Sequence, residues 1–377
     1  MKQQAQGVRV QVAIAEANYE MMDAAVQTIM SLLGKGPWLK NLKGKQVFLK
    51  PNLLGMFPLE NGATTNPALV SAMVRLLLDA GAKVTVGDNC GVGGYGLNER
   101  VARHTGVFDA SLGTYRNVAT ATKLVKLKSR YLDSLVVSKD MLDADVLINL
   151  PKMKTHSLTI VTGAVKNMFG LISGAGKGKS HAAAPAGEDF GRILAEIFSI
   201  RPPDFTVMDA VMAMEGNGPS AGKPKHVGRI LASDNAVALD AVMCGIMGIR
   251  PDLVHHIREA SSMGHGPIDR ASIDVVGEMP GDLKFRLPVT VSRFRLSRVV
   301  NSGFFANLVR SKLVLDKDRC RKCGICNKEC PTGAMQMDEY PVIDQTKCIR
   351  CLCCQELCPD GAWSLKGLMG RMQGYGV

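Results

Sequence analysis

The sequence predicts an α/β fold with a mostly parallel sheet and flanking helices, followed by a small α+β domain at the C-terminal end. Two observations support this prediction. Over roughly residues 8–280, apolar runs of strand length alternate with segments of helical periodicity, which is the order typical of parallel sheets. The last fifth of the chain instead carries a repeated pattern of closely spaced cysteines. With 377 residues, the chain is long enough for two or three domains.

The first elements follow a β-α-β-α-β order. Alternation of apolar and polar residues marks the first strand, and the later strands are short apolar runs. The second helix opens with Asn66-Pro67, because proline is favoured in the first turn of a helix, and Gly81 follows it. Strands are expected at residues 8–13, 46–49 and 83–86, and helices at 19–33 and 66–78.

The second half of the α/β region repeats this order, with an apolar helix at 235–247. A basic, partly amphipathic stretch follows at 287–315; it is expected to be a helical linker, with a helix on a membrane surface as the alternative. Strands are expected at 145–149, 205–208, 229–232 and 274–276. The expected organisation is an α/β domain at 1–290, possibly in two lobes, a basic linker at 291–311, a cysteine-rich domain at 312–367 and a tail at 368–377.

Eight cysteines form two runs of the pattern C-x2-C-x2-C-x3-C-P, closed by Pro331 and Pro359. This spacing holds a pair of [4Fe–4S] clusters, in which each run gives three thiolates to one cluster and its fourth to the other. Zinc sites usually combine two C-x2-C pairs, and disulfides do not suit a reducing compartment. The expected ligands are Cys320, Cys323, Cys326 and Cys358 for the first cluster, and Cys348, Cys351, Cys354 and Cys330 for the second.

The two runs belong to an internal repeat in which each half predicts a short strand, a cysteine loop and a short helix. Residues 314–334 align with a second copy that begins at Val342, and Thr332-Gly333-Ala334 corresponds to Asp360-Gly361-Ala362. This region resembles the bacterial two-cluster ferredoxin domain. Cys353 is an extra thiol that the pattern does not need; we expect it to pack beside a cluster, with an exchange of ligands as the alternative.

Composition limits the compartment and the partners. No stretch approaches 18 apolar residues, so no transmembrane segment is expected. The N-terminus has no apolar h-region, and with reduced thiols this predicts the cytoplasm. The net charge of +12 suits an anionic substrate, an acidic redox partner or nucleic acid. Nucleic acid is not expected as a partner, because only 5% of the residues are aromatic and no binding motif is present.

Polar side chains follow several of the predicted strands, where ligands bind in open α/β sheets. The densest group lies in the segment 149–167, in which Lys152, Lys154 and Lys166 are placed to bind an anion and His156 to donate a proton. If residues 157–169 form a helix, the amides of its first turn add further donors. The alternative is an ordinary loop of solvated lysines. Lys50-Pro51-Asn52 and Asp88-Asn89-Cys90 follow two other strands, and Cys90 is a candidate reactive thiol.

Two glycine-rich segments complete the candidates. Residues 170–181 partly match the P-loop template, but Ser173 stands where that template needs glycine. We therefore expect this segment to be a flexible lid. Residues 209–219 place Asp209, Glu215 and Asn217 in what the pattern predicts to be a turn after a strand. A carboxylate there suits a proton relay or a metal, whereas the alternative is a tight turn without chemistry.

The α/β region resembles the DUF362 family, whose members are often fused to a ferredoxin domain. The resemblance rests on Lys50-Pro51-Asn52, Thr65-Asn66-Pro67, Gly87-Asp88, residues 151–156, residues 162–167, residues 215–219 and residues 238–241. It implies the fold but no particular reaction. The family is also similar in architecture to lactate-racemase-like proteins, which use a nickel-pincer nucleotide, but no ligand residue for that cofactor can be mapped here.

These patterns lead to a functional hypothesis, a ferredoxin-coupled reductase. An external low-potential electron carrier of ferredoxin or flavodoxin type supplies two [4Fe–4S] clusters, and the electrons reach a small anionic substrate or a bound organic cofactor of unknown identity. The expected catalytic residues are His156, Lys154 and Glu215. The expected substrate-binding residues are Asn52, Lys152, Lys166, Asn167 and Asn217. The alternative is an electron-transfer or assembly subunit that docks to a partner redox enzyme.

Overall fold

The structure is a computed structural model that describes residues 9–91, 97–185, 187–281, 283–292, 312–358 and 360–366. The predicted linker at 291–311 lies outside the described residues except for its first two positions, and the predicted tail at 368–377 lies wholly outside them. Within the described part of the chain, no helix is long and apolar enough to cross a membrane.

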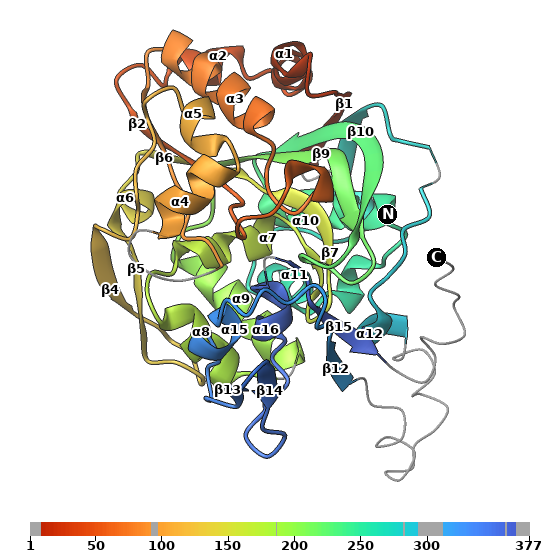
Figure 1. Ribbon diagram of the computed structural model, residues 1–377. Coiled ribbons are helices and arrows are strands. Elements are labelled where there is room, and N and C mark those ends of the chain that lie inside the picture. The colour runs from red at the N-terminus through yellow and green to blue at the C-terminus, as the bar shows by residue number, and fades with distance from the viewer. Residues whose placement is uncertain are drawn as a thin grey trace.

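A mixed, mostly parallel sheet of nine strands forms the centre of the α/β domain (Figure 1). Its main path runs β11-β1-β10-β9-β6-β2-β3, and β7 joins it beside β9 and carries β8 on its other edge. Neighbours are parallel except in the pairs β1/β10, β10/β9 and β7/β8. The strands are β1 (Val10–Glu16), β2 (Gln46–Pro51), β3 (Lys83–Val86), β6 (Val146–Leu150), β7 (Lys152–His156), β8 (Ile160–Thr162), β9 (Phe205–Glu215), β10 (Lys223–Ser233) and β11 (Ile273–Gly277).

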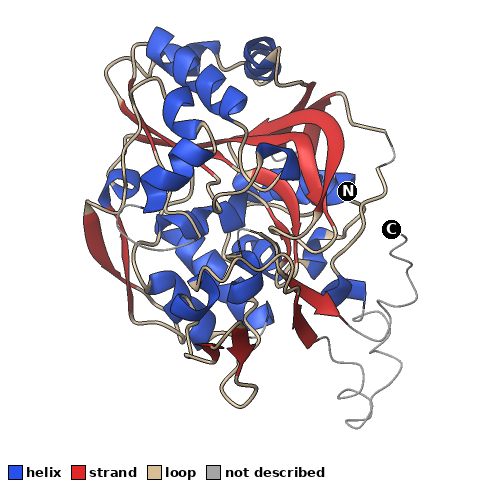
Figure 2. Ribbon diagram, in the orientation of Figure 1, coloured by secondary structure: helices blue, strands red, loops and turns tan. Residues whose placement is uncertain are grey.

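Helices cover both faces of the sheet (Figure 2). The α/β fold expected from the sequence is therefore confirmed. The short hairpin of β4 (Thr122–Lys126) and β5 (Ser134–Ser138) lies apart from the main sheet. The helices are α1 (Met22–Leu32), α2 (Gly36–Lys40), α3 (Pro67–Asp79), α4 (Leu97–His104), α5 (Val107–Ala110), α6 (Lys139–Leu142), α7 (Ala164–Asn167), α8 (Gly176–Ala183), α9 (Gly187–Ile200), α10 (Ala236–Ile246), α11 (His255–Ser262) and α12 (Val289–Ser292).

Two apolar cores lie on opposite faces of the sheet, because successive side chains of a strand point to opposite faces. In β2, Phe48 belongs to the core beneath α9, α10 and α11, whereas Val47 and Leu49 belong to the core beneath α1 and α3. Strand ends are buried on both sides in this arrangement. This is why Lys50, at the end of β2, is fully buried although it carries a charge.

Three segments differ from their sequence-based predictions. Residues 157–169 do not form one helix: β7 turns back into β8, with Ile160 in the left-handed region at φ 71°, and only the short α7 follows. Residues 209–215 are not a turn, because β9 continues to Glu215 and pairs with β10 along this length. The glycine-rich segment predicted as a lid forms α8, a helix.

The C-terminal domain is a small α+β unit built from two copies of one pattern. Its strands form two antiparallel pairs, and each cysteine run contains one short helix. The domain lies against the side of the α/β domain that carries α8 and α9 (blue in Figure 1). Its elements are β12 (Lys312–Leu315), α15 (Ile325–Lys328), β13 (Met335–Met337), β14 (Pro341–Ile343), α16 (Cys353–Glu356) and β15 (Trp363–Lys366).

Candidate functional site

The eight cysteines predicted as ligands surround two small spaces in the C-terminal domain. The two runs exchange their fourth cysteines, as the spacing predicts: Cys358 lies with the first three cysteines of the first run, and Cys330 lies with those of the second run. The first space is lined by Cys320, Cys323, Cys326 and Cys358. The second is lined by Cys330, Cys348, Cys351 and Cys354, together with Cys353.

The two cysteine loops also share their backbone conformation. Lys322 and Arg350 are left-handed at φ 58° and 55°, and Gly324 and Leu352 at φ 72° and 62°. Both pairs stand at the same places relative to the first cysteine of their run. Left-handed conformations are uncommon for residues other than glycine and are kept where the surroundings demand them. The repeat seen in the sequence is thus a repeat of loop geometry.

The chemistry of the thiols fits an iron–sulfur cluster in each space. All eight are free thiols. Among the described residues, no three His, Cys, Asp or Glu side chains stand close enough to hold a single metal ion. Burial raises the pKa of Cys354, and the neighbouring thiols Cys351, Cys326 and Cys348 raise it further. Thiols this close together lose their protons readily only beside a positive charge, which the irons of a [4Fe–4S] cluster would supply.

A cavity of about 360 Å³ opens where the C-terminal domain meets the α/β domain. Its α/β wall comes from the ends of β2 and β7, from α7 and from α8. Its other wall comes from the C-terminal domain and includes Cys330, Cys353 and Glu356. Cys330 and Cys353 therefore border both this cavity and the second cysteine-lined space. Of the residues predicted to bind or transform a substrate, the cavity lining includes Asn52, Lys154, Lys166 and Asn167.

Lys154 lies in the cavity wall without a carboxylate partner. Its Nζ donates to Asn52 Oδ1 at 2.9 Å and to the carbonyl oxygen of Ala63 at 2.5 Å. Burial holds the pKa of Lys154 well below its usual value, and the charge of Lys166 lowers it further. A lysine of this kind exchanges protons closer to neutral pH than a solvated one does.

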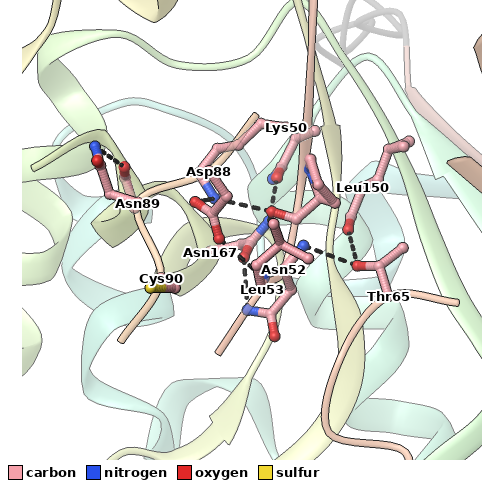
Figure 3. A network of polar contacts seen from close by, with 12 residues as sticks. Lys50, Asn52, Leu53, Thr65, Asp88, Asn89, Cys90, Leu150 and Asn167 are labelled. Atoms are coloured by element: carbon pink, nitrogen blue, oxygen red, sulfur yellow. Dashed lines mark hydrogen bonds and ion pairs between the residues drawn. The ribbon is translucent and has the colours of Figure 1, made fainter. Parts of the chain in front are cut away.

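The partner of Lys154, Asn52, belongs to a network of amides. Figure 3 shows its contact with Asn167. Asn52 donates from Nδ2 to Asn167 Oδ1 at 2.7 Å, and Asn167 donates in turn to Asn149 Oδ1 at 2.7 Å and to the carbonyl oxygen of Pro51 at 3.4 Å. Lys50 pairs with Asp88 at 2.8 Å in the same region. Because these groups satisfy one another, Asn167 orients its neighbours and has no N–H left for a ligand.

His156 is not part of the cavity lining, and its side chain contacts Glu356 of the C-terminal domain. Its Nδ1 accepts backbone N–H groups from Leu158 and Thr159 at 3.1 and 3.3 Å, and its Nε2 contacts Glu356 Oε1. Burial lowers the pKa of His156 to about 4, so the ring is neutral with its proton on Nε2. Glu356 also lies 3.9 Å from Lys166 Nζ and 4.0 Å from His181 Nε2.

Three other predicted residues lie outside the cavity lining, each held by a structural partner. Lys152 is fully buried, and its Nζ pairs with Asp209 at 2.7 Å. Asp209 also accepts a hydrogen bond from the Tyr19 hydroxyl at 3.1 Å. Glu215, near the end of β9, accepts the backbone N–H of Arg286 and lies 3.4 Å from Lys225 Nζ. Asn217 accepts the backbone N–H of Val289 at 3.1 Å. None of these three residues lines the cavity together with Lys154 and Lys166.

The cavity lining also includes Phe169, Lys177 and His181, which were not predicted as site residues. Lys177 and His181 stand one turn apart on α8. Burial lowers the pKa of Lys177 to about 8 and that of His181 to about 4. The sequence does carry a signal for them, since a lysine and a histidine four residues apart share one face of a helix. That signal is visible only once the glycine-rich segment is known to be helical.

Comparison with known proteins gives four likenesses, two to individual proteins and two to family models. The thylakoid-associated protein sll1697 of Synechocystis sp. is 33% identical over 296 residues, which are 74% of this chain and 88% of that protein. The lactate racemase apoprotein from Thermoanaerobacterium thermosaccharolyticum is a similar solved structure, with a TM-score of 0.42 and 15% sequence identity. The match covers 65% of this chain and 58% of the racemase chain. A 4Fe-4S dicluster domain matches residues 312–360. The domain of unknown function DUF362 matches residues 47–245, more than half of the sequence, and the chain therefore belongs to the DUF362 family.

Proposed function

We propose that this protein is a ferredoxin-coupled reductase that acts on a small anionic substrate, or on an organic cofactor, held in the cavity between its two domains. When bound, two [4Fe–4S] clusters supply single electrons, which an external low-potential carrier of ferredoxin or flavodoxin type provides. The observation that carries the proposal is the position of Cys330, which borders both the second cysteine-lined space and the cavity. A ligand in the cavity would thus lie next to the source of electrons.

The cavity residues have complementary tasks in this proposal. Lys166 and Lys177 hold the negative charge of the ligand, and Lys154 hands over a proton, because burial places its pKa well below that of a solvated lysine. Asn52 and Asn167 keep Lys154 in position. The balance of the reaction is simple: two electrons from two carrier molecules and two protons add to one unsaturated bond of the substrate. Thiolate-bound clusters suit a reducing compartment, so we propose the cytoplasm as the location.

Anaerobic purification tests this function. The protein is reconstituted with iron and sulfide, reduced with dithionite, freed of excess reductant and mixed with anionic metabolites, while absorption records its reoxidation. A reductase is reoxidised by at least one small anion and converts it to a product two electrons more reduced. Lys154→Met should abolish this conversion with the iron content unchanged, whereas Lys123→Met, at an exposed position of β4, should not. Reoxidation by protein carriers alone would contradict the proposal and favour an electron-transfer or assembly subunit.

A further inference from the structure

The cavity contains an aromatic ring with two lysines beside it. Lys166 Nζ lies 5.7 Å and Lys177 Nζ 5.8 Å from the centroid of the Phe169 ring. Phe169 is fixed by edge-to-face contacts with His181 and Phe190, at centroid distances of 5.9 and 5.6 Å. An apolar face next to cations favours a ligand that is flat and negatively charged.

The charges in the wall indicate how much negative charge the ligand carries. Lys154 is fully buried and Lys166 and Lys177 are largely buried, whereas Lys179 and Lys328 are exposed to water. Asp88 is already paired with Lys50. Among the buried charges of the described lining, Glu356 then stands against three lysines. Glu329 also lines the cavity but is partly exposed, so the lysines outnumber the buried carboxylate, and burial makes this excess costly unless an anion is bound. Lys166 and Lys177, which both lie near Phe169, can each meet one charged group of such a ligand.

Hydrogen-bonding capacity toward the cavity is also unused. Lys154 and Lys177 each give two of three N–H groups to oxygens of the protein, Lys177 to the carbonyls of Asn89 and Cys90 at 2.5 and 2.7 Å. His181 Nδ1 and Thr162 Oγ1 are buried in the same lining and have no partner within the described residues. Buried polar atoms are nearly always paired, so these two atoms mark hydrogen-bonding capacity in the wall that the described residues do not use.

We propose that the cavity binds a planar, conjugated anion with two negative charges, its flat face on Phe169 and its charged groups at Lys166 and Lys177. This inference rests on the reductase function, because it names the substrate class of the same cavity. Conjugation suits the chemistry, since a delocalised π system accepts one electron at a time more readily than a saturated carbon chain. His181, held neutral by burial and stacked on Phe190 at a centroid distance of 4.2 Å, supplies an uncharged hydrogen-bonding nitrogen.

Calorimetry on the oxidised, cluster-containing protein tests this inference with three probes. Terephthalate is planar, conjugated and doubly charged; trans-cyclohexane-1,4-dicarboxylate has the same charges without conjugation; benzoate has the ring and one charge. We expect terephthalate to bind about three- to tenfold more tightly than the saturated acid, as aromatic contacts allow. Its advantage over benzoate should be about tenfold or more, as expected for one charge-assisted contact.

Three variants assign these preferences to residues. Phe169→Leu should remove the difference between terephthalate and the saturated acid, and Lys177→Met the difference between terephthalate and benzoate. Lys123→Met, at an exposed position of β4 that is not part of the cavity lining, should change neither. The iron content and circular dichroism of each variant show that it is folded. Equal binding of terephthalate and the saturated acid, equal binding of terephthalate and benzoate, or no binding of any probe would overturn the inference.

The outcome is separate from that of the proposed function, because binding is measured without an electron donor. If terephthalate binds as expected but no small anion reoxidises the reduced protein, the reductase function fails and the binding inference stands. If the reduced protein is reoxidised by a small anion while terephthalate does not compete with that anion, the inference fails and the reductase function stands.

Discussion

At the residue scale, the buried lysines divide by the partner that each one has. Lys50 pairs with Asp88, and Lys152 pairs with Asp209. Neither of these two lysines lines the cavity. Lys154 binds neutral oxygens and does line it. The sequence brings Lys152 and Lys154 together in one short motif and gives no local signal that separates them. Their partners come from segments distant in the sequence, so their different roles could not be predicted from the motif.

This difference predicts opposite results for two neighbouring substitutions. Lys152→Met leaves the buried carboxylate of Asp209 without its cation, and this should lower the free energy of unfolding by about 3–5 kcal/mol. Lys154→Met removes a buried cation that has no carboxylate partner, so stability should be unchanged or slightly higher while terephthalate binding weakens. Urea unfolding and calorimetry measure the two effects. Equal destabilisation by both substitutions would contradict the assignment.

Lys177 predicts that ligand binding depends on pH. Its pKa is about 8 because of burial; Asp88 and Cys90 raise it, whereas Lys50 and Lys166 lower it. A bound anion favours the charged form and raises this pKa toward its usual value near 10.5. Between about pH 8 and 10 the complex therefore holds a proton that the free protein has released, and binding takes up a proton.

Calorimetric titration with terephthalate in two buffers of different ionisation enthalpy measures this uptake. We expect close to one proton at about pH 9 and little at pH 6, where Lys177 is already charged in the free protein. Lys177→Met should remove most of the uptake at pH 9. The pH interpretation is wrong if the number of protons taken up at pH 9 is the same in that variant as in the unaltered protein.

At the element scale, long-range pairing decides what the local patterns leave open. The strand expected at 83–86 and the helix from Asn66 were predicted well, because their caps and periodicity are local. The helix expected at 157–169 is instead a hairpin and a short helix. β7 gains partners on both sides, from β8 and from β9, and such pairing outweighs local helical preference. The hairpin directs the side chain of Lys154 into the cavity wall.

The start of α7 predicts the effect of a single methyl group. Asp240 accepts the backbone N–H groups of Ala164 and Val165 at 2.6 and 2.9 Å and so fixes the helix that carries Lys166. A Cβ at Gly163 would lie 2.2 Å from Asp240 Oδ1. Gly163→Ala should therefore cost about 1–3 kcal/mol in unfolding free energy and weaken anion binding.

Gly245→Ala is the matched control for this substitution, because a Cβ at that position in α10 meets no atom within 4 Å. It should be neutral or stabilise the helix by up to about 1 kcal/mol, with binding unchanged. Thermal unfolding and calorimetry of the two variants give the comparison. A Gly163→Ala variant as stable as the control, with full affinity, would show that the contact between Asp240 and α7 does not position Lys166.

The spacing of the cysteines predicts two ligand sets that exchange their fourth thiol, and the structure places four of these cysteines around each space. Iron analysis tests that assignment. Cys358→Ser should reduce the content from about eight irons per chain toward about four, because it removes a thiolate from the first set. Cys353→Ser should leave about eight irons, since the second set has four thiols without it. A loss of iron in the Cys353 variant would instead make that thiol a ligand.

At the scale of the whole molecule, the cavity exists because two domains meet. The C-terminal domain closes it with Cys330, Cys353 and Glu356, and Ser220 of the α/β domain donates to the carbonyl oxygen of Gln355 at 3.0 Å. The sequence predicts each domain separately, but it contains no local pattern for the contact between them. Tertiary packing brings Glu356, a residue without sequence signal, against His156, Lys166 and His181.

Substitution of Glu356 therefore tests how much this residue contributes to the docking of the two domains. It is the carboxylate that faces Lys166 across the contact, and its removal leaves that buried cation uncompensated, at a cost of about 3–5 kcal/mol to the docking of the domains. Glu356→Ala should keep about eight irons but increase hydrogen exchange in β7 and α8 and slow reoxidation by a bound anion at least about tenfold. Glu356→Gln, which still accepts the N–H of His156, should show a smaller effect on both measurements. Unchanged exchange and an unchanged rate in the alanine variant would mean that the domains dock without this contact, and that the cavity owes its closed wall to apolar packing around Leu357.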